Sequence, residues 1–93
     1  MPFKTTRGAL EETLLALGYS ATQGHNEFGF PYVEFRHASK GAAIALQVVD
    51  PKETLNPSDL LSAEHSVEWS GITDVKAFYK LLRDKTPKEL LAA

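Results

Sequence analysis

Apolar and polar residues alternate in two runs near the middle of the chain, on either side of a polar break at residues 39–41. Side chains alternate along a strand, so Val33 and Phe35 share one face of the first run, which covers residues 32–38. Residues 44–48 repeat the pattern, with an aliphatic side chain at every second position. The two runs predict an antiparallel hairpin with one apolar face.

Two further stretches space their apolar residues as an amphipathic helix does. Leucines recur at intervals of four and three over residues 6–17, between a threonine cap and Gly18, which suits a left-handed C-terminal cap. The same spacing over about residues 75–84 follows a cap at Thr73 or Asp74. We expect both helices to pack on the apolar face of the sheet.

Shorter patterns predict three additional elements. Residues 19–23 alternate weakly and predict a short strand before a glycine-containing loop. An Asn-Pro pair predicts the start of a short helix over residues 57–63. Residues 66–70 alternate again, with Val67 and Trp69 on one face, and predict one more strand.

The chain ends on a capping-box sequence at residues 86–89, which predicts a terminal helical turn. Together the elements predict an α+β fold in a single domain, residues 1–93. Its three- or four-stranded antiparallel sheet would carry helices on one face, in an α-β-β-β-α-like order.

Composition narrows the class of protein. Ninety-three residues with 43% hydrophobic and 24% charged residues are typical of one globular domain, which hides roughly 60–65% of its extended surface on folding. The absence of cysteine excludes disulfides, thiolate metal sites and cysteine nucleophiles. We expect no cofactor. No apolar run resembles a signal peptide or a membrane span, so we expect a cytoplasmic protein with no membrane partner.

Charge is distributed unevenly around a net value of -2. Residues 1–49 balance, residues 50–69 carry a local -4, and residues 70–93 carry a local +2. Binding to nucleic acid through the phosphate backbone requires a surplus of cations. The composition therefore favours a protein partner over nucleic acid.

Three aromatic residues stand two positions apart at the start of the hairpin, and charged residues follow them at the same interval. In an extended chain these five side chains would share the face opposite the apolar one. Either another element covers the rings, or they form an exposed ridge that anchors a protein interface or stacks bases. The candidate binding residues are Phe28, Phe30, Tyr32, Glu34 and Arg36.

A basic stripe is predicted along the last long helix. Lys76, Lys80 and Arg83 recur at i, i+4 and i+7 and form this secondary candidate site. Such a stripe could meet phosphates or an acidic protein surface. It could equally be a solvated flank whose aliphatic stems cover apolar neighbours.

Three histidines are the candidates for acid-base or metal chemistry. His25 lies in a polar loop where Glu27 could orient it, and it is the alternative catalytic residue. His37 falls on the apolar face of its strand, where a structural role is expected. His65 precedes the strand predicted over 66–70. Their spacings match no local ligand pattern, so we expect no metal site and no catalytic cluster.

Part of the chain, about residues 8 to 48, resembles the HicA-type toxins, which are small ribonucleases. The resemblance is carried by Leu17-Gly18-Tyr19, Gly24-His25, Phe35-Arg36-His37 and Lys40-Gly41. It implies His25 as the catalytic histidine. The chain departs from the family in having Asn26 where a second histidine is expected, four extra residues before Phe35, and no overall basic character.

The sequence as a whole favours a small, non-enzymatic protein-interaction module, such as a phage- or plasmid-type inhibitor or accessory protein. The alternative is a HicA-like ribonuclease or RNA-binding module that uses His25 and the basic stripe. A third interpretation is a homodimer formed through an unpaired strand edge.

Overall fold

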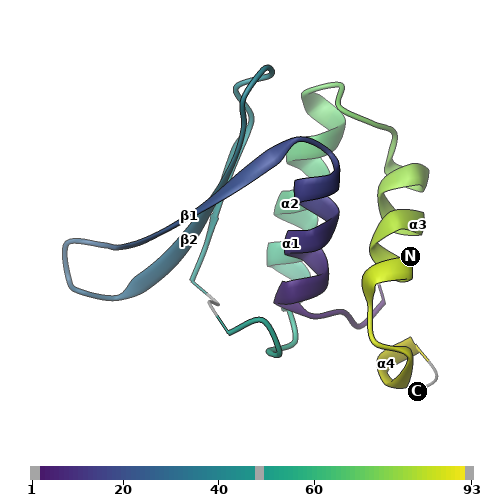
Figure 1. Cartoon of the computed structure of the whole chain (residues 1–93), viewed down its shortest axis with the longest axis horizontal. Coiled ribbons are helices and arrows are strands. Elements are labelled where there is room, and N and C mark those ends of the chain that lie inside the picture. The colour runs from purple at the N-terminus through teal and green to yellow at the C-terminus, as the bar shows by residue number, and fades with distance from the viewer. Residues whose placement is uncertain (1–2, 48–49, 92–93) are drawn as a thin grey trace.

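The computed structural model describes residues 3–47 and 50–91, which confirm a small α+β fold with an antiparallel sheet (Figure 1). Within these residues every helix is too short or too polar to cross a membrane. The strands are β1 (Tyr19–His25), β2 (Pro31–His37) and β3 (Ala43–Leu46). The helices are α1 (Arg7–Ala16), α2 (Pro57–Trp69), α3 (Val75–Lys85) and α4 (Lys88–Leu91).

The sheet has the strand order β1-β2-β3, and both pairs are antiparallel. The hairpin predicted from the two alternating runs is confirmed as β2 and β3, in a register that pairs Val33 with Leu46. The weak alternation after Gly18 forms β1, which runs two residues further than predicted, to His25. Val48, expected on the apolar face, lies outside the described residues.

Helix α1 begins and ends where its caps predict. The side chain of Thr6 accepts a hydrogen bond from the Ala9 N–H at 3.1 Å, which satisfies one of the free donors at the helix start. Gly18 follows the helix with φ +99°, a conformation that residues with a Cβ rarely adopt. Leu10 and Leu14 are fully buried on the face toward the core.

The strand predicted over residues 66–70 is wrong, because helix α2 continues without a break from Pro57 to Trp69. Leu60, Ala63 and Val67 are its buried residues, and their intervals of three and four are helical. Residues two apart on a helix point to different sides. Val67 is therefore buried while the Trp69 side chain is 78% exposed.

The predicted packing of α3 on the sheet is also wrong. The sheet is covered by α1, which contacts β1, and by α2, which contacts β3. Helix α3 contacts α1 and α2 and forms a third layer on their far side (Figure 1). Its amphipathic pattern is real, since Phe78 and Leu82 are fully buried, but the surface that buries them is helical.

The N-terminal segment is tied to the loop before α2 by three backbone hydrogen bonds. The N–H of Arg7 donates to the Glu53 carbonyl at 2.9 Å, and the N–H of Gly8 donates to the Pro51 carbonyl at 2.9 Å. In the third, the N–H of Leu55 donates to the Thr5 carbonyl at 3.0 Å. A Cβ on Gly8 would lie 2.9 Å from the Pro51 oxygen, so this close approach requires glycine.

A buried pair of hydroxyl groups ties the same segment to the end of α3. The Thr86 hydroxyl donates to the Leu82 carbonyl at 2.7 Å, and the Thr5 hydroxyl, 2.6 Å from that of Thr86, donates to it in turn. Helix α4 forms the predicted terminal turn. The Thr86 side chain is engaged with these two partners and not in the predicted capping box.

His37 links the end of α1 to the turn between β2 and β3. Its Nε2 donates to the Leu17 carbonyl at 2.9 Å, which leaves Nδ1 as the acceptor for the Lys40 N–H at 3.2 Å. A Cβ added to Gly18 would lie 2.7 Å from Nε2 of His37. His37 therefore has the structural role expected of it.

Alanine at two glycines with positive φ should separate backbone strain from this contact. Gly29, with φ +86°, has nothing within 4 Å of an added Cβ, so Gly29→Ala should lower the free energy of unfolding by about 1 kcal/mol through strain alone. Gly18→Ala should cost about 2–3 kcal/mol, because it also displaces the His37 ring. Urea unfolding measures both values. In a His37→Ala background the difference should shrink, and equal losses in the parent background would contradict the contact.

Candidate functional site

The turn between β1 and β2, residues Asn26–Phe30, is held by a dense set of hydrogen bonds; we call it the hairpin tip. Oδ1 of Asn26 accepts from the N–H groups of Phe28 at 2.9 Å and Phe30 at 3.0 Å. The Asn26 backbone bonds to Phe30 and to Gly29, both at 2.9 Å. Gly29 reverses the chain with its positive φ. The tip is therefore an ordered turn with a defined shape.

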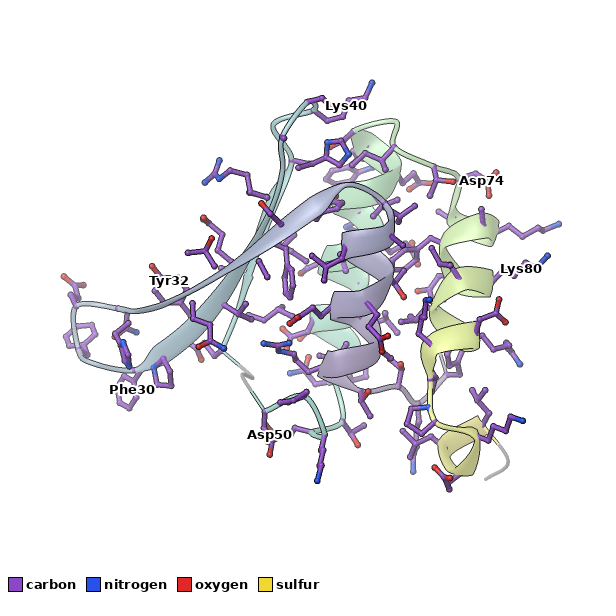
Figure 2. All side chains as sticks on the ribbon, in the orientation of Figure 1. Phe30, Tyr32, Lys40, Asp50, Asp74 and Lys80 are labelled. Carbon is purple, nitrogen blue, oxygen red and sulfur yellow. The ribbon has the colours of Figure 1, made fainter. Side chains whose placement is uncertain are left out.

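Two phenylalanines on this ordered turn are exposed. The side chain of Phe28 is 77% exposed and that of Phe30 is 63% exposed. The sequence left open whether these rings would be covered, and within the described residues they are not. Figure 2 shows Phe30 at the end of the hairpin, away from the helices.

The other three candidate binding residues follow on β2. Tyr32, Glu34 and Arg36 lie on one face of this strand, and the buried Val33 and Phe35 lie on the other. No helix of the described chain covers the face with the three candidate residues. The Arg36 guanidinium and the Glu34 carboxylate form an ion pair, with a nitrogen–oxygen distance of 3.2 Å. We call this surface the open face of the sheet.

Tyr32 is half-buried because its ring lies over the backbone of Gly24 on β1, its partner in the register. A Cβ at Gly24 would be 2.8 Å from the Tyr32 hydroxyl oxygen. The glycine therefore creates the space that the ring occupies. This contact holds Tyr32 in place next to the hairpin tip.

The hairpin tip and the open face together present two exposed aromatic rings beside an ion pair. Exposed aromatic rings on an ordered turn lose little conformational entropy when they are buried by a partner. Covering each ring contributes about 2 kcal/mol from apolar area alone. The five residues predicted from their spacing thus lie along one strand and its preceding turn.

His25 ends β1 and lines a shallow hollow beside the tip, together with Gln23, Gly24, Pro31 and Tyr32. Among these residues Tyr32 is the one other titratable side chain. General acid-base cleavage requires groups on both sides of the scissile bond. The hollow offers His25 no carboxylate or second imidazole to share that task.

The remaining histidine, His65, lies on α2 with its ring stacked on Trp69, at a centroid distance of 4.6 Å and an angle of 13°. It borders a different hollow, between α2 and β3. His37 is committed to the contacts at the end of α1. Within residues 3–47 and 50–91, no group of three or more His, Asp or Glu side chains could hold a metal ion.

The predicted basic stripe borders a groove that runs along α3, which we call the α3 groove. Lys76, Lys80 and Arg83 lie on it as exposed side chains. Phe3 and Glu64 in the lining were not predicted, since they come from segments distant in sequence. The groove is lined by Phe3, Glu64, Val75, Lys76, Tyr79, Lys80 and Arg83.

Two contacts organise the α3 groove. The guanidinium of Arg83 lies over the Phe3 ring, 4.8 Å from its centroid. The Tyr79 hydroxyl donates to Oε1 of Glu64 at 2.6 Å. Burial, the hydrogen bond to Glu64 and the charge of that carboxylate all raise the pKa of Tyr79. The proton therefore stays on the Tyr79 oxygen, and Glu64 is engaged from within the protein.

Comparison with protein-family models, with curated proteins and with solved structures finds no match for the chain. The resemblance to HicA-type toxins therefore rests on its short motifs alone. Function has to be inferred from the hairpin tip, the open face and the α3 groove.

Tyr79→Phe should change how stability depends on pH. The raised pKa means that the folded protein holds the Tyr79 proton more tightly than the unfolded chain, whose tyrosines titrate near the ordinary value of 10.0. The resulting stability is complete below that value and is lost as pH rises above it. Tyr79→Phe should therefore destabilise by about 1 kcal/mol at pH 7, yet flatten the loss of stability above pH 10. Urea unfolding from pH 8 to 11 measures both effects, and an unchanged alkaline slope would contradict the interaction.

Proposed function

We propose that this chain is a non-enzymatic binding protein that engages a partner protein through the hairpin tip and the open face. The observation that carries the proposal is the exposure of Phe28 and Phe30 on a turn fixed by Asn26. Large apolar side chains in such positions are typical anchors of protein interfaces. The neighbouring Glu34 and Arg36 give the contact a polar rim.

An inhibitor or accessory role of phage or plasmid type is the form of this function that we propose. A protein of this kind acts by covering a surface of its target, and a projecting turn with two exposed rings can enter a concave site there. This role requires no bond-breaking chemistry in the chain itself.

Removing the two rings should abolish partner capture without unfolding the protein. Phe28→Ala combined with Phe30→Ala removes exposed side chains, so the free energy of unfolding should change by no more than about 0.5 kcal/mol per site. Immobilised parent and variant proteins would be incubated with native lysate, and captured proteins quantified by mass spectrometry. Species retained by the parent should be absent from the double variant.

The matched control is Leu15→Ala, which removes a 45% exposed apolar side chain on α1, outside the proposed contact. It should capture the same species as the parent. Loss of stability in the double variant would place the rings in the core and contradict the proposal.

Sedimentation velocity at several concentrations tests the homodimer, for which β1 and β3 provide the two sheet edges. A dimer that the double variant disrupts would identify the partner as a second copy.

RNA should remain intact in the presence of the protein, because the lining of the hollow offers His25 neither a carboxylate nor a second imidazole as a partner in proton transfer. The assay incubates labelled single-stranded RNA with the parent and with His25→Ala, with and without a chelator. Metal-independent cleavage that His25→Ala abolishes would refute the binding function and establish the ribonuclease alternative.

A further inference from the structure

A second surface, the α3 groove, combines an apolar floor with a cationic rim. Phe3, Val75 and Tyr79 provide aromatic and aliphatic lining. An adjoining hollow continues from Phe3 to Lys4 and the leucines of α4. The apolar lining of the groove thus extends past the end of α3.

The cations of this rim have no ionic partner in the described part of the chain. The ion pairs there join Arg7 to Glu11 and Arg36 to Glu34, and neither involves α3. Lys76, Lys80 and Arg83 are exposed, and Arg83 contacts the Phe3 ring.

Three cations along one side of an apolar groove are complementary to an acidic, amphipathic ligand. The one carboxylate in the lining, Glu64, already accepts the Tyr79 hydroxyl. Carboxylates of a ligand could therefore pair with cations that form no ion pair within the described chain, and its apolar side chains could pack on the floor of the groove.

The spacing of the rim matches a helix. Lys76, Lys80 and Arg83 are separated by four and three residues, or about 6 Å and 4.5 Å along the axis of α3. Carboxylates at i, i+4 and i+7 of a second helix repeat the same two intervals. The lining comes from α2, α3 and Phe3, so no strand edge is present to pair with an extended peptide. A helix satisfies its own backbone groups and needs no such edge.

Nucleic acid fits the same surface less well. The carboxylate of Glu64 in the lining would repel phosphates, and the Phe3 ring is already covered on one side by Arg83. The chain carries a net charge of -2, which gives no general attraction to a polyanion.

We infer that the α3 groove binds an acidic amphipathic helix of a protein partner, with its carboxylates on Lys76, Lys80 and Arg83 and its apolar side chains on Phe3, Val75 and Tyr79. This surface is separate from the hairpin tip. The inference does not depend on the function proposed for the tip.

The probe is a fluorescein-labelled, alanine-based helical peptide with glutamates at i, i+4 and i+7 and leucines beside them at i+3 and i+10. Fluorescence anisotropy at low salt should show saturable binding to the parent protein. Lys76→Glu combined with Lys80→Glu should weaken it by at least about tenfold, since opposite charges become like charges. Peptides with glutamine for glutamate, or alanine for leucine, should bind about tenfold more weakly as well.

Lys40→Glu combined with Lys52→Glu is the matched control, because it makes the same change in net charge at exposed lysines outside the groove. It should retain binding, as should Phe28→Ala combined with Phe30→Ala. The capture experiment thus tests the hairpin tip and the peptide experiment tests the α3 groove, so either proposal can fail while the other holds.

Three outcomes would overturn the inference. One is the absence of peptide binding at millimolar concentration, and another is equal binding by the α3 charge-reversal variant and the parent. The third is that a single-stranded oligonucleotide, or vesicles containing phosphatidylserine, bind more strongly than the peptide and lose that binding in the α3 charge-reversal variant. This result would assign the groove to phosphates.

Discussion

The pairing of residues 5–8 with residues 51–55 is the constraint on which the arrangement of helices depends. The first N–H groups of a helix have no partner within it, and in α1 two of them donate to the carbonyls of Pro51 and Glu53. The Thr5 hydroxyl adds a bond to Thr86, 81 residues away, at the end of α3. These bonds hold the start of α1, the approach to α2 and the end of α3 at one end of the molecule. They also place Phe3 beside α3 and so complete the groove.

Where a local pattern had one physical interpretation, the sequence predicted the element. The threonine cap of α1 is Thr6, and α3 is capped by Asp74, one of the two residues that the sequence left open. Gly18 follows α1 with the positive φ expected of it, and β2 and β3 pair as the alternation indicated. Residues 66–70 fit both a strand and a helix. Val67 and Trp69 are two positions apart, as on one face of a strand, while Leu60 and Val67 are seven positions apart, as on one face of a helix. The absence of glycine or proline between Pro57 and Gly71 was the signal that favoured one long helix. The surface against which α3 packs is a tertiary property that its amphipathic pattern does not contain.

In the candidate sites, too, some residues were indicated by local spacing and others depend on tertiary packing. The two-residue spacing of Phe28, Phe30 and Tyr32 assumed an extended chain, but Phe28 and Phe30 lie in the turn before β2. Their exposure depends on how far the hairpin extends beyond the helices. The basic stripe was visible from helical spacing. Phe3 and Glu64 join it through the N-terminal pairing and the packing of α2 on α3, which link distant parts of the chain. No periodicity in the sequence could have indicated them.

The hairpin tip and α3 lie at opposite ends of the longest axis, along which the molecule measures 39 Å (Figure 1). Two ligands seated at these ends would not obstruct each other, so a single copy can tether both at once. Where one partner carries both ligands, the second would meet its site at an effective concentration set by the spacing between the two ends. Such a partner would be held more tightly than through either proposed contact alone.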